Sequence, residues 1–326
     1  MSTTVEQERM TGGDGPPPRR RRRWFSWTVA VLLAVWAVVR VFGLEFWSFP
    51  TQLMTVTPIG VGIAAVAGGI MLLRNRRAAI VAFAACVAMA AVVVPRAFGE
   101  PSTAAGAPLK VLTINLFGRG DADTVVELVK RFDPDVLTAL ELTPREVERL
   151  RVAGLEQLLP YNVLEAEFGA TGSGLYGKHP LTKIEGMFTP IGHNMPAARL
   201  DLPSGSVEVV AVHPNPPLGR MEAEWNASLK ALPSPSPQVI RVLAGDFNAS
   251  LDHRAFRDLL DRGYVDAAEQ VGKALVPTWP NGRKMPPIIT IDHVLADERA
   301  GVKRVEVLDV PNTDHRAVFA ELSLPR

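Results

Sequence analysis

Polar side chains capable of acid–base or metal chemistry recur at or just beyond the ends of apolar, strand-like runs in the second part of the chain. Carboxylate and amide oxygens suit Mg²⁺, Mn²⁺ or Ca²⁺, whereas zinc would require Cys or His at short spacings, which the six histidines do not provide. Strand ends held by a packed sheet have little freedom, so such side chains can converge. The residues concerned are Asn115, Glu141, His213, Asp246, Asn248, Asp292 and His315.

This set of side chains suits the hydrolysis of a phosphate ester. That reaction needs a cation to neutralise developing charge, a base for water, and positive groups beside the non-bridging oxygens. Each signal alone has a structural alternative: Asn115 could terminate a strand, Glu141 could be a solvated strand end, and residues 245–248 could be only a turn. Their joint order along one domain favours the chemical interpretation.

The elements that would position these residues alternate between strands and helices. Hairpins mixed with strand–helix units predict an α/β or α+β sandwich rather than a doubly wound parallel sheet. Strands are predicted at 109–116, 135–142, 238–244, 288–295, 302–310 and 317–324, with a hairpin over 199–212 that ends at His213. Helices are predicted after Asp121 or Asp123, after the capping box Thr143-Pro144-Arg145-Glu146, and at 219–232 and 251–260.

The order of these patches resembles the endonuclease/exonuclease/phosphatase superfamily, which includes DNase I-like nucleases, inositol polyphosphate phosphatases and neutral sphingomyelinases. The resemblance covers residues 109–326 and implies a four-layered sandwich of two mixed β-sheets flanked by helices, with a divalent-metal phosphoesterase site at one end. It rests on 111–116 (VLTINL), 135–141 (DVLTALE), 212–213 (VH), 245–248 (GDFN), 291–295 (IDHVL) and 313–315 (TDH).

The resemblance implies a metal site. Asn115 and Glu141 look like the metal-holding pair, and Asp314 would support the metal or its surroundings. Mg²⁺ is the expected ion, with Mn²⁺ or Ca²⁺ as alternatives. One departure is Gly177, because many members of the superfamily carry serine at this position. That difference puts a polar contact near the site in doubt.

The resemblance also implies the catalytic roles. Asp246 looks like the residue that orients or deprotonates the attacking water, with Asn248 beside it. His315 would contact the scissile phosphate while paired with Asp292, and His213 resembles the histidine that binds a phosphate oxygen. A carboxylate beside His315 would favour the imidazolium, which is a cation where phosphate charge accumulates.

The remaining histidines and one tryptophan receive structural or surface roles. His179, His193 and His253 fall in predicted loops or on a helix and are expected at the surface. His293 follows Asp292 on a strand, so its side chain should point to the opposite face of the sheet. Trp279 matches a loop that the superfamily places near the site, and we expect it chiefly to pack.

The first part of the chain has the composition of a membrane region. Residues 1–23 are polar, rich in Gly and Pro, and end in five arginines, which predicts a disordered basic tail. Residues 24–96 are predicted to form three transmembrane helices at about 24–44, 53–73 and 78–95, since a span needs about 20 apolar residues. Residues 97–108 read as a linker to the catalytic domain at 109–326.

Basic clusters predict the topology. The arginines at 19–23 and those at 74, 76 and 77 belong on the cytoplasmic side, which places the N-terminus inside and the catalytic domain outside the plasma membrane. Arg40, near the outer end of the first span, could extend to the interface. The alternatives are a cleaved signal peptide or buried core helices; no cleavage site is obvious, and the runs lack a polar face.

Net charge divides the chain in two. Residues 1–108 carry 11 basic and 5 acidic residues, 11 − 5 = +6, and residues 109–326 carry 24 and 29, 24 − 29 = −5. Nucleases that bind DNA without sequence preference rely on many cation–phosphate contacts. An acidic domain is therefore a poor candidate for strong nonspecific DNA binding, although a basic strip around Arg283 and Lys284 could exist.

The resulting hypothesis is a membrane-anchored, divalent-metal-dependent phosphoesterase that acts by metal-assisted attack of water on a phosphodiester or phosphomonoester. The substrate alternatives are DNA or RNA, and a lipid headgroup of the sphingomyelin or phosphoinositide type. Membrane lipids would contact the three spans, and no protein partner is indicated. A non-catalytic membrane receptor is the hypothesis from a different class.

Overall fold

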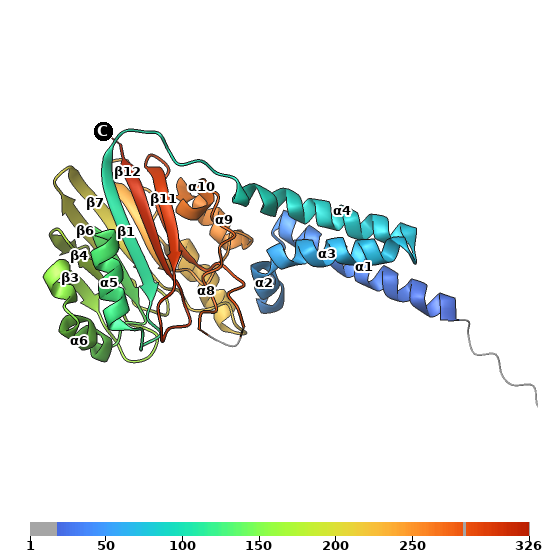
Figure 1. Cartoon of the computed structure of the whole chain (residues 1–326), viewed down its shortest axis with the longest axis horizontal. Helices are drawn as coiled ribbons and strands as arrows, with labels where there is room; N and C mark the ends of the chain where they lie inside the picture. Colours follow the sequence, from blue (N-terminus) through green and yellow to red (C-terminus); the bar gives the residue numbers. More distant parts are fainter. Residues whose placement is uncertain (1–17, 283–284, 326) are drawn as a thin grey trace, which may run out of the picture.

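The computed structural model describes residues 18–282 and 285–325 and divides them into a helical arm and a larger β-rich body (Figure 1). In the arm, α3 packs against both α1 and α4. A Cβ on Gly60 would approach Trp36 to 2.8 Å, and one on Gly68 would approach Phe83 to 3.0 Å, so small residues allow close helix packing. The arm comprises α1 (Pro18–Phe42), α2 (Ser48–Thr55), α3 (Thr57–Leu72), α4 (Arg76–Val93) and the 3₁₀ helix η1 (Val94–Ala97).

Among these described helices, two are long and apolar enough to cross a membrane, over Arg23–Phe42 and Arg76–Ala97. The predicted second span, 53–73, is wrong as a single helix: it breaks between α2 and α3, which are bent by 79°. Pro58 lies in the first turn of α3, where its ring and missing N–H prevent continuation from the preceding turn. If the bent pair counts as one span, the total is three.

The predicted tail and linker also differ from the structure. Residues 1–17 of the tail lie outside the described residues, and α1 begins at Pro18 rather than at residue 24. Residues 97–108 are not a free spacer, because the Ser102 amide donates to the Val302 carbonyl at 2.7 Å and the first strand already begins at Ala107. The connection to the body is therefore packed against it.

The body contains two six-stranded mixed sheets packed face to face (Figure 1). Strands β1 and β2 are parallel in the first sheet, β7 and β8 in the second, and all other neighbouring pairs are antiparallel. The first sheet has the order β11 (Gly301–Leu308), β12 (Ala317–Leu324), β1 (Ala107–Asn115), β2 (Val136–Leu140), β4 (Ser173–Gly177), β3 (Tyr161–Glu165). The second has the order β5 (Leu181–Lys183), β6 (Ala197–Leu202), β7 (Gly205–Val212), β8 (Ile240–Asp246), β10 (Asp292–Asp297), β9 (Tyr264–Asp266).

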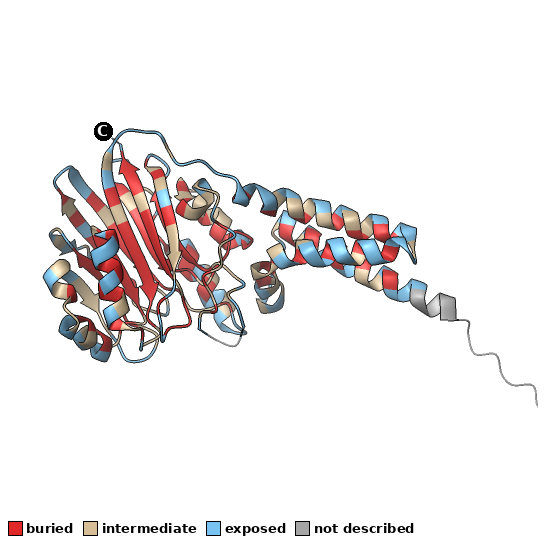
Figure 2. Cartoon of the chain, in the orientation of Figure 1, coloured by how far each residue is buried: buried red, intermediate tan, exposed pale blue. Residues whose placement is uncertain are grey.

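Short helices cover the outer faces of the sheets, so the central strands are buried on both sides (Figure 2). The predicted sandwich of two mixed sheets flanked by helices is confirmed. Two predicted helix starts are confirmed as well. Asp121 caps α5, and the Thr143 side chain accepts a hydrogen bond from the Glu146 amide at the start of α6. The helices are α5 (Ala122–Phe132), α6 (Pro144–Val152), α7 (Leu155–Leu158), α8 (Met221–Ala231), α9 (Arg254–Leu260) and α10 (Ala267–Gln270).

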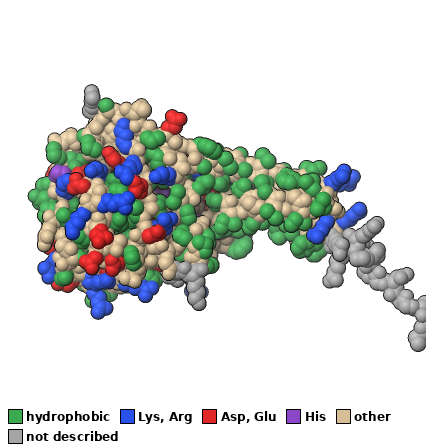
Figure 3. Space-filling model, in the orientation of Figure 1, with side chains coloured by type: hydrophobic (Ala, Val, Ile, Leu, Met, Phe, Trp, Pro, Cys, Tyr) green, Lys and Arg blue, Asp and Glu red, His purple; other side chains and the backbone are tan. Residues whose placement is uncertain are grey.

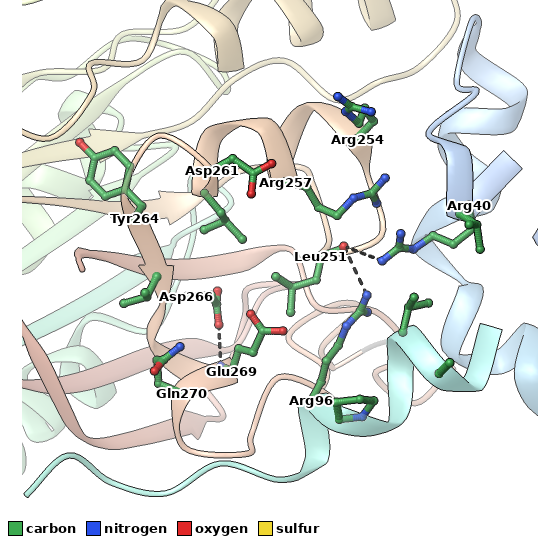
Figure 4. Close-up of a pocket in the computed structure, with 16 residues that line it drawn as sticks. Arg40, Arg96, Leu251, Arg254, Arg257, Asp261, Tyr264, Asp266, Glu269 and Gln270 are labelled. Carbon is green, nitrogen blue, oxygen red and sulfur yellow. Dashed lines mark hydrogen bonds between the residues drawn. The ribbon is translucent and has the colours of Figure 1, made fainter. Parts of the chain in front are cut away.

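A buried ion cluster joins the arm to the body. Asp252 lies two residues before the start of α9, and its carboxylate accepts hydrogen bonds from Arg40 near the end of α1 and from Arg96 at 2.7 and 2.8 Å. Figure 4 shows both guanidinium groups also converging on the Leu251 carbonyl. The expectation that Arg40 extends to the lipid interface is therefore wrong, because its charge is buried and matched inside the protein.

His253 adds a second contact at this joint. Its Nε2 donates to the Thr51 carbonyl of α2 at 2.9 Å, and its Nδ1 accepts from the Ser250 amide at 2.8 Å. The expected surface role for His253 is wrong, since its ring is fully buried. Its partner on the arm is about two hundred residues away in sequence, which no local pattern could indicate.

We expect Asp252→Asn to destabilise the joint strongly. The variant leaves two buried guanidinium groups without a charge partner, which costs about 3–5 kcal/mol. Thermal unfolding of the full chain in detergent measures the loss. Asp258→Asn, which removes an exposed pair with Arg254, is the matched control and should cost below about 1 kcal/mol. Equal shifts for the two variants would contradict a stabilising role for the cluster.

The pH dependence of stability should carry a contribution from His253. Burial lowers its pKa to about 4, below the ordinary value of about 6.5 that applies in the unfolded chain. The unfolded state therefore binds a proton first, so stability is complete above pH 6.5 and falls as the pH drops toward 4. His253→Gln should flatten the difference in melting temperature between pH 7 and pH 4.5. A variant with the unchanged wild-type slope would refute this assignment.

Candidate active site

The candidate residues converge at one edge of the sandwich because the strands that carry them end there. Parallel neighbours β1 and β2 bring Asn115 beside Glu141, and β7 and β8 bring His213 beside Asp246. Strand β10 runs antiparallel to β8, so its first residue, Asp292, pairs with the last residue of β8. His315 lies two residues before β12, which is antiparallel to β1. Both sheets therefore contribute to one site.

Asp246 lies at the centre of this group. Its Oδ1 accepts from the Asn248 backbone amide at 2.8 Å, and its Oδ2 accepts from Asn115 Nδ2 at 3.1 Å. The same Oδ2 is 3.6 Å from His315 Nε2 and 3.7 Å from His213 Nε2. Burial raises the pKa of Asp246 to about 7, and the neighbouring imidazolium only partly opposes this. Asp246 is thus a carboxylate that can take up a proton near neutral pH.

His315 and Asp292 form a buried ion pair. His315 Nδ1 lies 3.1 and 3.0 Å from the two Asp292 oxygens, which leaves Nε2 facing Asp246. Burial opposes the charged imidazolium, but Asp292 and Asp246 outweigh it and raise the pKa of His315 to about 10. This residue therefore presents a proton at Nε2 toward the centre of the site.

Asn115 links the two sheets and also binds Glu141. Asn115 Nδ2 donates to Glu141 Oε1 at 3.2 Å as well as to Asp246, so one amide lies between two carboxylates. Glu141 adopts a left-handed backbone conformation with φ +50°, which turns the chain directly after β2. Burial, assisted by the charges of Asp314 and Asp292, raises the pKa of Glu141.

Asp314 and Asn248 lie at the border of this group. Asp314 Oδ2 accepts from Trp279 Nε1 at 3.2 Å, and its Oδ1 is 4.0 Å from His315 Nε2. The tryptophan expected near the site therefore also holds a site carboxylate. Asn248 serves Asp246 through its backbone amide, whereas its side chain donates to the Pro214 carbonyl at 3.0 Å.

Sequence reasoning missed His193. Its Nδ1 lies 3.1 Å from Nδ1 of His213, and it is half-buried rather than at the surface. Burial, with the charges of His193 and His315, lowers the pKa of His213 well below its usual range, so His213 is neutral. The two rings come from segments twenty residues apart, and no spacing signal connects them. His293, in contrast, has the predicted structural role, bound to Asp266 at 2.6 Å.

A polar cavity of about 510 Å³ adjoins the site at Asp314. Arg119 and Arg149 line it, and both were missed because they occur singly on a loop and a helix. The basic strip expected at Arg283 and Lys284 lies outside the described residues. A phosphate-bearing substrate would find positive charge in this cavity.

The edge suits a divalent cation. Its described side chains supply four carboxylates, Glu141, Asp246, Asp292 and Asp314, against the single protonated imidazole of His315. Burial is the main cause of the raised pKa values of Glu141 and Asp246, and the neighbouring carboxylates raise both pKa values further. Ligand atoms of Asp246, Asp292 and His315 lie within 4.8 Å of one another, and because His315 is protonated only the two carboxylates of this group could bind a cation. The set Asn115, Glu141 and Asp314 remains a prediction.

Gly177 does not affect this edge. It pairs with Val136 at the start of β2, whereas the site lies beyond Leu140, the last residue of that strand. Four residues along a strand correspond to about 13 Å. A Cβ here would lie 2.9 Å from the His179 carbonyl oxygen, so glycine fits a close approach of the backbone.

Comparison with solved structures finds the same fold. Humanized D. rerio TDP2 superposes with a TM-score of 0.55 at 16% identity, covering 66% of this chain and 99% of that one. D. rerio TDP2 with a single-strand DNA product gives 0.54 at 16% identity, covering 67% and 99%. The 3′-5′ exonuclease NExo from Neisseria meningitidis gives 0.50 at 20% identity, covering 66% and 100%.

A search of curated protein sequences finds no relative of this chain. The family model described as Endonuclease/Exonuclease/phosphatase family matches residues 112–315, well over half of the chain and nearly all of the two-sheet body. The match begins in β1, just before Asn115, and ends at His315, so it spans the whole candidate site. The chain therefore belongs to the endonuclease/exonuclease/phosphatase family, whose members hydrolyse phosphoester bonds.

Proposed function

We propose that this protein is a membrane-anchored, divalent-metal-dependent phosphoesterase that hydrolyses a phosphodiester or phosphomonoester. The observation that carries the proposal is the convergence on Asp246 of a protonated His315, the Asn115 amide and His213, beside Glu141. Within one edge of the sandwich, Asp246 supplies a base, the His315 imidazolium supplies a proton and a positive charge, and Asn115 supplies a hydrogen-bond donor. These are the functions that phosphoester hydrolysis requires.

Each side chain has a defined task in this proposal. Asp246 orients the attacking water and accepts its proton, held in position by the Asn248 amide. His315 donates from Nε2 to a phosphate oxygen, and Asp292 fixes the ring through Nδ1. A bound divalent cation, Mg²⁺ by the preference of oxygen donors, would neutralise charge on the phosphate, with Glu141, Asn115 and Asp314 as its proposed ligands.

The arrangement of the arm supports anchoring. Arg40, near the end of α1, and Arg96, just beyond α4, bind the same Asp252, so both helices end at the body. If α1 and α4 each cross the bilayer, α3 must return between them despite its break from α2. Large apolar side chains along the arm are exposed, as membrane helices require (Figure 3). They include Leu32, Val66, Ile80 and Val87.

Charge supports one orientation. Exposed Arg74, Arg76 and Arg77 occupy the connector between α3 and α4, and basic side chains gather at the end of the arm far from the body (Figure 3). Such clusters stay on the cytoplasmic side. We therefore propose a multi-pass plasma-membrane protein with a cytoplasmic N-terminus and an extracytoplasmic catalytic body.

Loss of catalysis should follow removal of either central group. We expect Asp246→Asn and His315→Gln each to lower kcat about 10²–10⁴-fold, the usual contribution of a positioned acid or base. Turnover by the purified full chain is measured on DNA, RNA, phosphoinositides and sphingomyelin, with Mg²⁺ and with EDTA. Asp258→Asn, which removes an exposed ion pair with Arg254, is the control and should retain activity. Full, chelator-resistant turnover in both site variants would refute the mechanism.

Topology can be measured separately. A periplasmic-type phosphatase reporter fused after the C-terminus should be active, because the body is expected outside the cytoplasm. The same reporter fused after Arg77, in the connector, should be inactive. An inactive C-terminal fusion together with an active connector fusion would reverse the proposed orientation and change the accessible substrates.

A further inference from the structure

An apolar groove of about 350 Å³ extends from the catalytic edge to the arm. At one end it is lined by His315 and Asn248, which belong to the site. At the other end it is lined by Thr55 and Val56, where α2 bends into α3. The groove therefore connects the reacting groups with the part of the chain proposed to enter the membrane.

Hydrogen bonds hold one wall of this groove at both ends. Ser48, the first residue of α2, donates to the Pro217 carbonyl at 3.0 Å and accepts from the Gly219 amide at 2.9 Å. On the catalytic side, Asn248 donates to the Pro214 carbonyl at 3.0 Å. The wall at residues 216–218 is thus fixed between the arm and the site.

Helix α2 has the features of an interfacial helix. It lies at 79° to α3, so α2 would lie nearly in the membrane plane if α3 crosses the bilayer. Phe46, Trp47 and Phe49 are 70%, 60% and 70% exposed around its first turn. Aromatic side chains of this kind favour the boundary between lipid headgroups and hydrocarbon. The groove would then open beside the bilayer surface.

The lining chemistry favours a hydrocarbon chain over a nucleic acid. Of the described residues that line the groove, only His315 has an ionisable side chain. Leu218 and Ile288 on its walls are 48% and 38% exposed, which leaves apolar surface uncovered. Nucleic-acid grooves instead carry cations along the backbone. The arginine-lined cavity at Asp314 is a separate, polar surface at the same edge.

We propose that the substrate is a lipid phosphate ester taken from the membrane, with its apolar chain in this groove and its phosphate at Asp246 and His315. The inference rests on the proposed phosphoesterase function and names its substrate class. Anchoring and the groove then act together, because the arm holds the site beside the bilayer that supplies the lipid. The polar remainder of the headgroup would face the cavity of Arg119 and Arg149.

Chain length tests this assignment. The full chain, kept in amphipol so that no phospholipid is added, is assayed with Mg²⁺ on a series of alkyl p-nitrophenyl phosphodiesters from methyl to dodecyl. We expect kcat/KM to rise by up to about fourfold for each methylene until the groove is filled. Hydrolysis of the methyl ester with no gain along the series, or faster hydrolysis of single-stranded DNA, would overturn the lipid assignment while leaving the phosphoesterase function intact.

Groove variants locate the effect. Leu218→Asn and Ile288→Asn should each lower the dodecyl-to-methyl ratio of kcat/KM about tenfold or more. Val152→Asn replaces an exposed aliphatic residue on α6 and is the matched control, which should keep the wild-type ratio. A ratio that is unchanged in both groove variants would place the apolar chain elsewhere and overturn the proposal.

Binding is measured independently of turnover. A dodecyl phosphonate with a diazirine at the chain end, which cannot be hydrolysed, should crosslink to the groove residues of the full chain, at 52–56, 216–218 or 288–291. Failure of all ester hydrolysis with crosslinking retained would refute the proposed catalytic function but support the lipid site. Crosslinks found only on α1, α4 or the part of α3 after its first turn would overturn the lipid site.

Discussion

The Asn115 amide is the contact on which the catalytic edge depends. It lies between Glu141 of the first sheet and Asp246 of the second, and it donates to both. Without a donor there, the buried carboxylate of Asp246 and the partly buried one of Glu141 would face one another with no compensation. Behind it, the Thr138 hydroxyl reaches the Ala244 carbonyl at 3.3 Å, which also crosses from sheet to sheet. The same contacts therefore set the distance between the two sheets and the positions of the site residues.

At the joint between arm and body, buried charges of opposite sign are paired. Asp252 is surrounded by protein, and its charge is tolerated because two guanidinium groups and their geometry offset the loss of water. Burial works against the carboxylate charge, yet Arg96 and Arg40 outweigh it and lower the pKa of Asp252. With His253 bound to Thr51, these contacts position α2 beside the catalytic edge. The groove exists because of that placement.

Much of the body could be predicted because its signals are local. Apolar runs bounded by turn residues indicated most strands, and Thr143 with Glu146 indicated a helix start that the structure has. The Gly-containing strand β4 (Ser173–Gly177) and the short strands β3, β5 and β9 were missed, because none shows a clear period. The single second span was wrong, since its mean apolarity concealed the break before Pro58.

The polar residues at strand ends, the apolar character of the arm and the charge difference between arm and body can be read from the sequence alone, because they depend only on residue type and order. Which side chains meet depends on the packing of the folded chain. His193 lies against His213, Arg40 binds Asp252, and residues 216–218 line a groove with α2. Each of these contacts joins segments far apart in the chain, so its formation depends on how sheets and helices pack rather than on any local pattern.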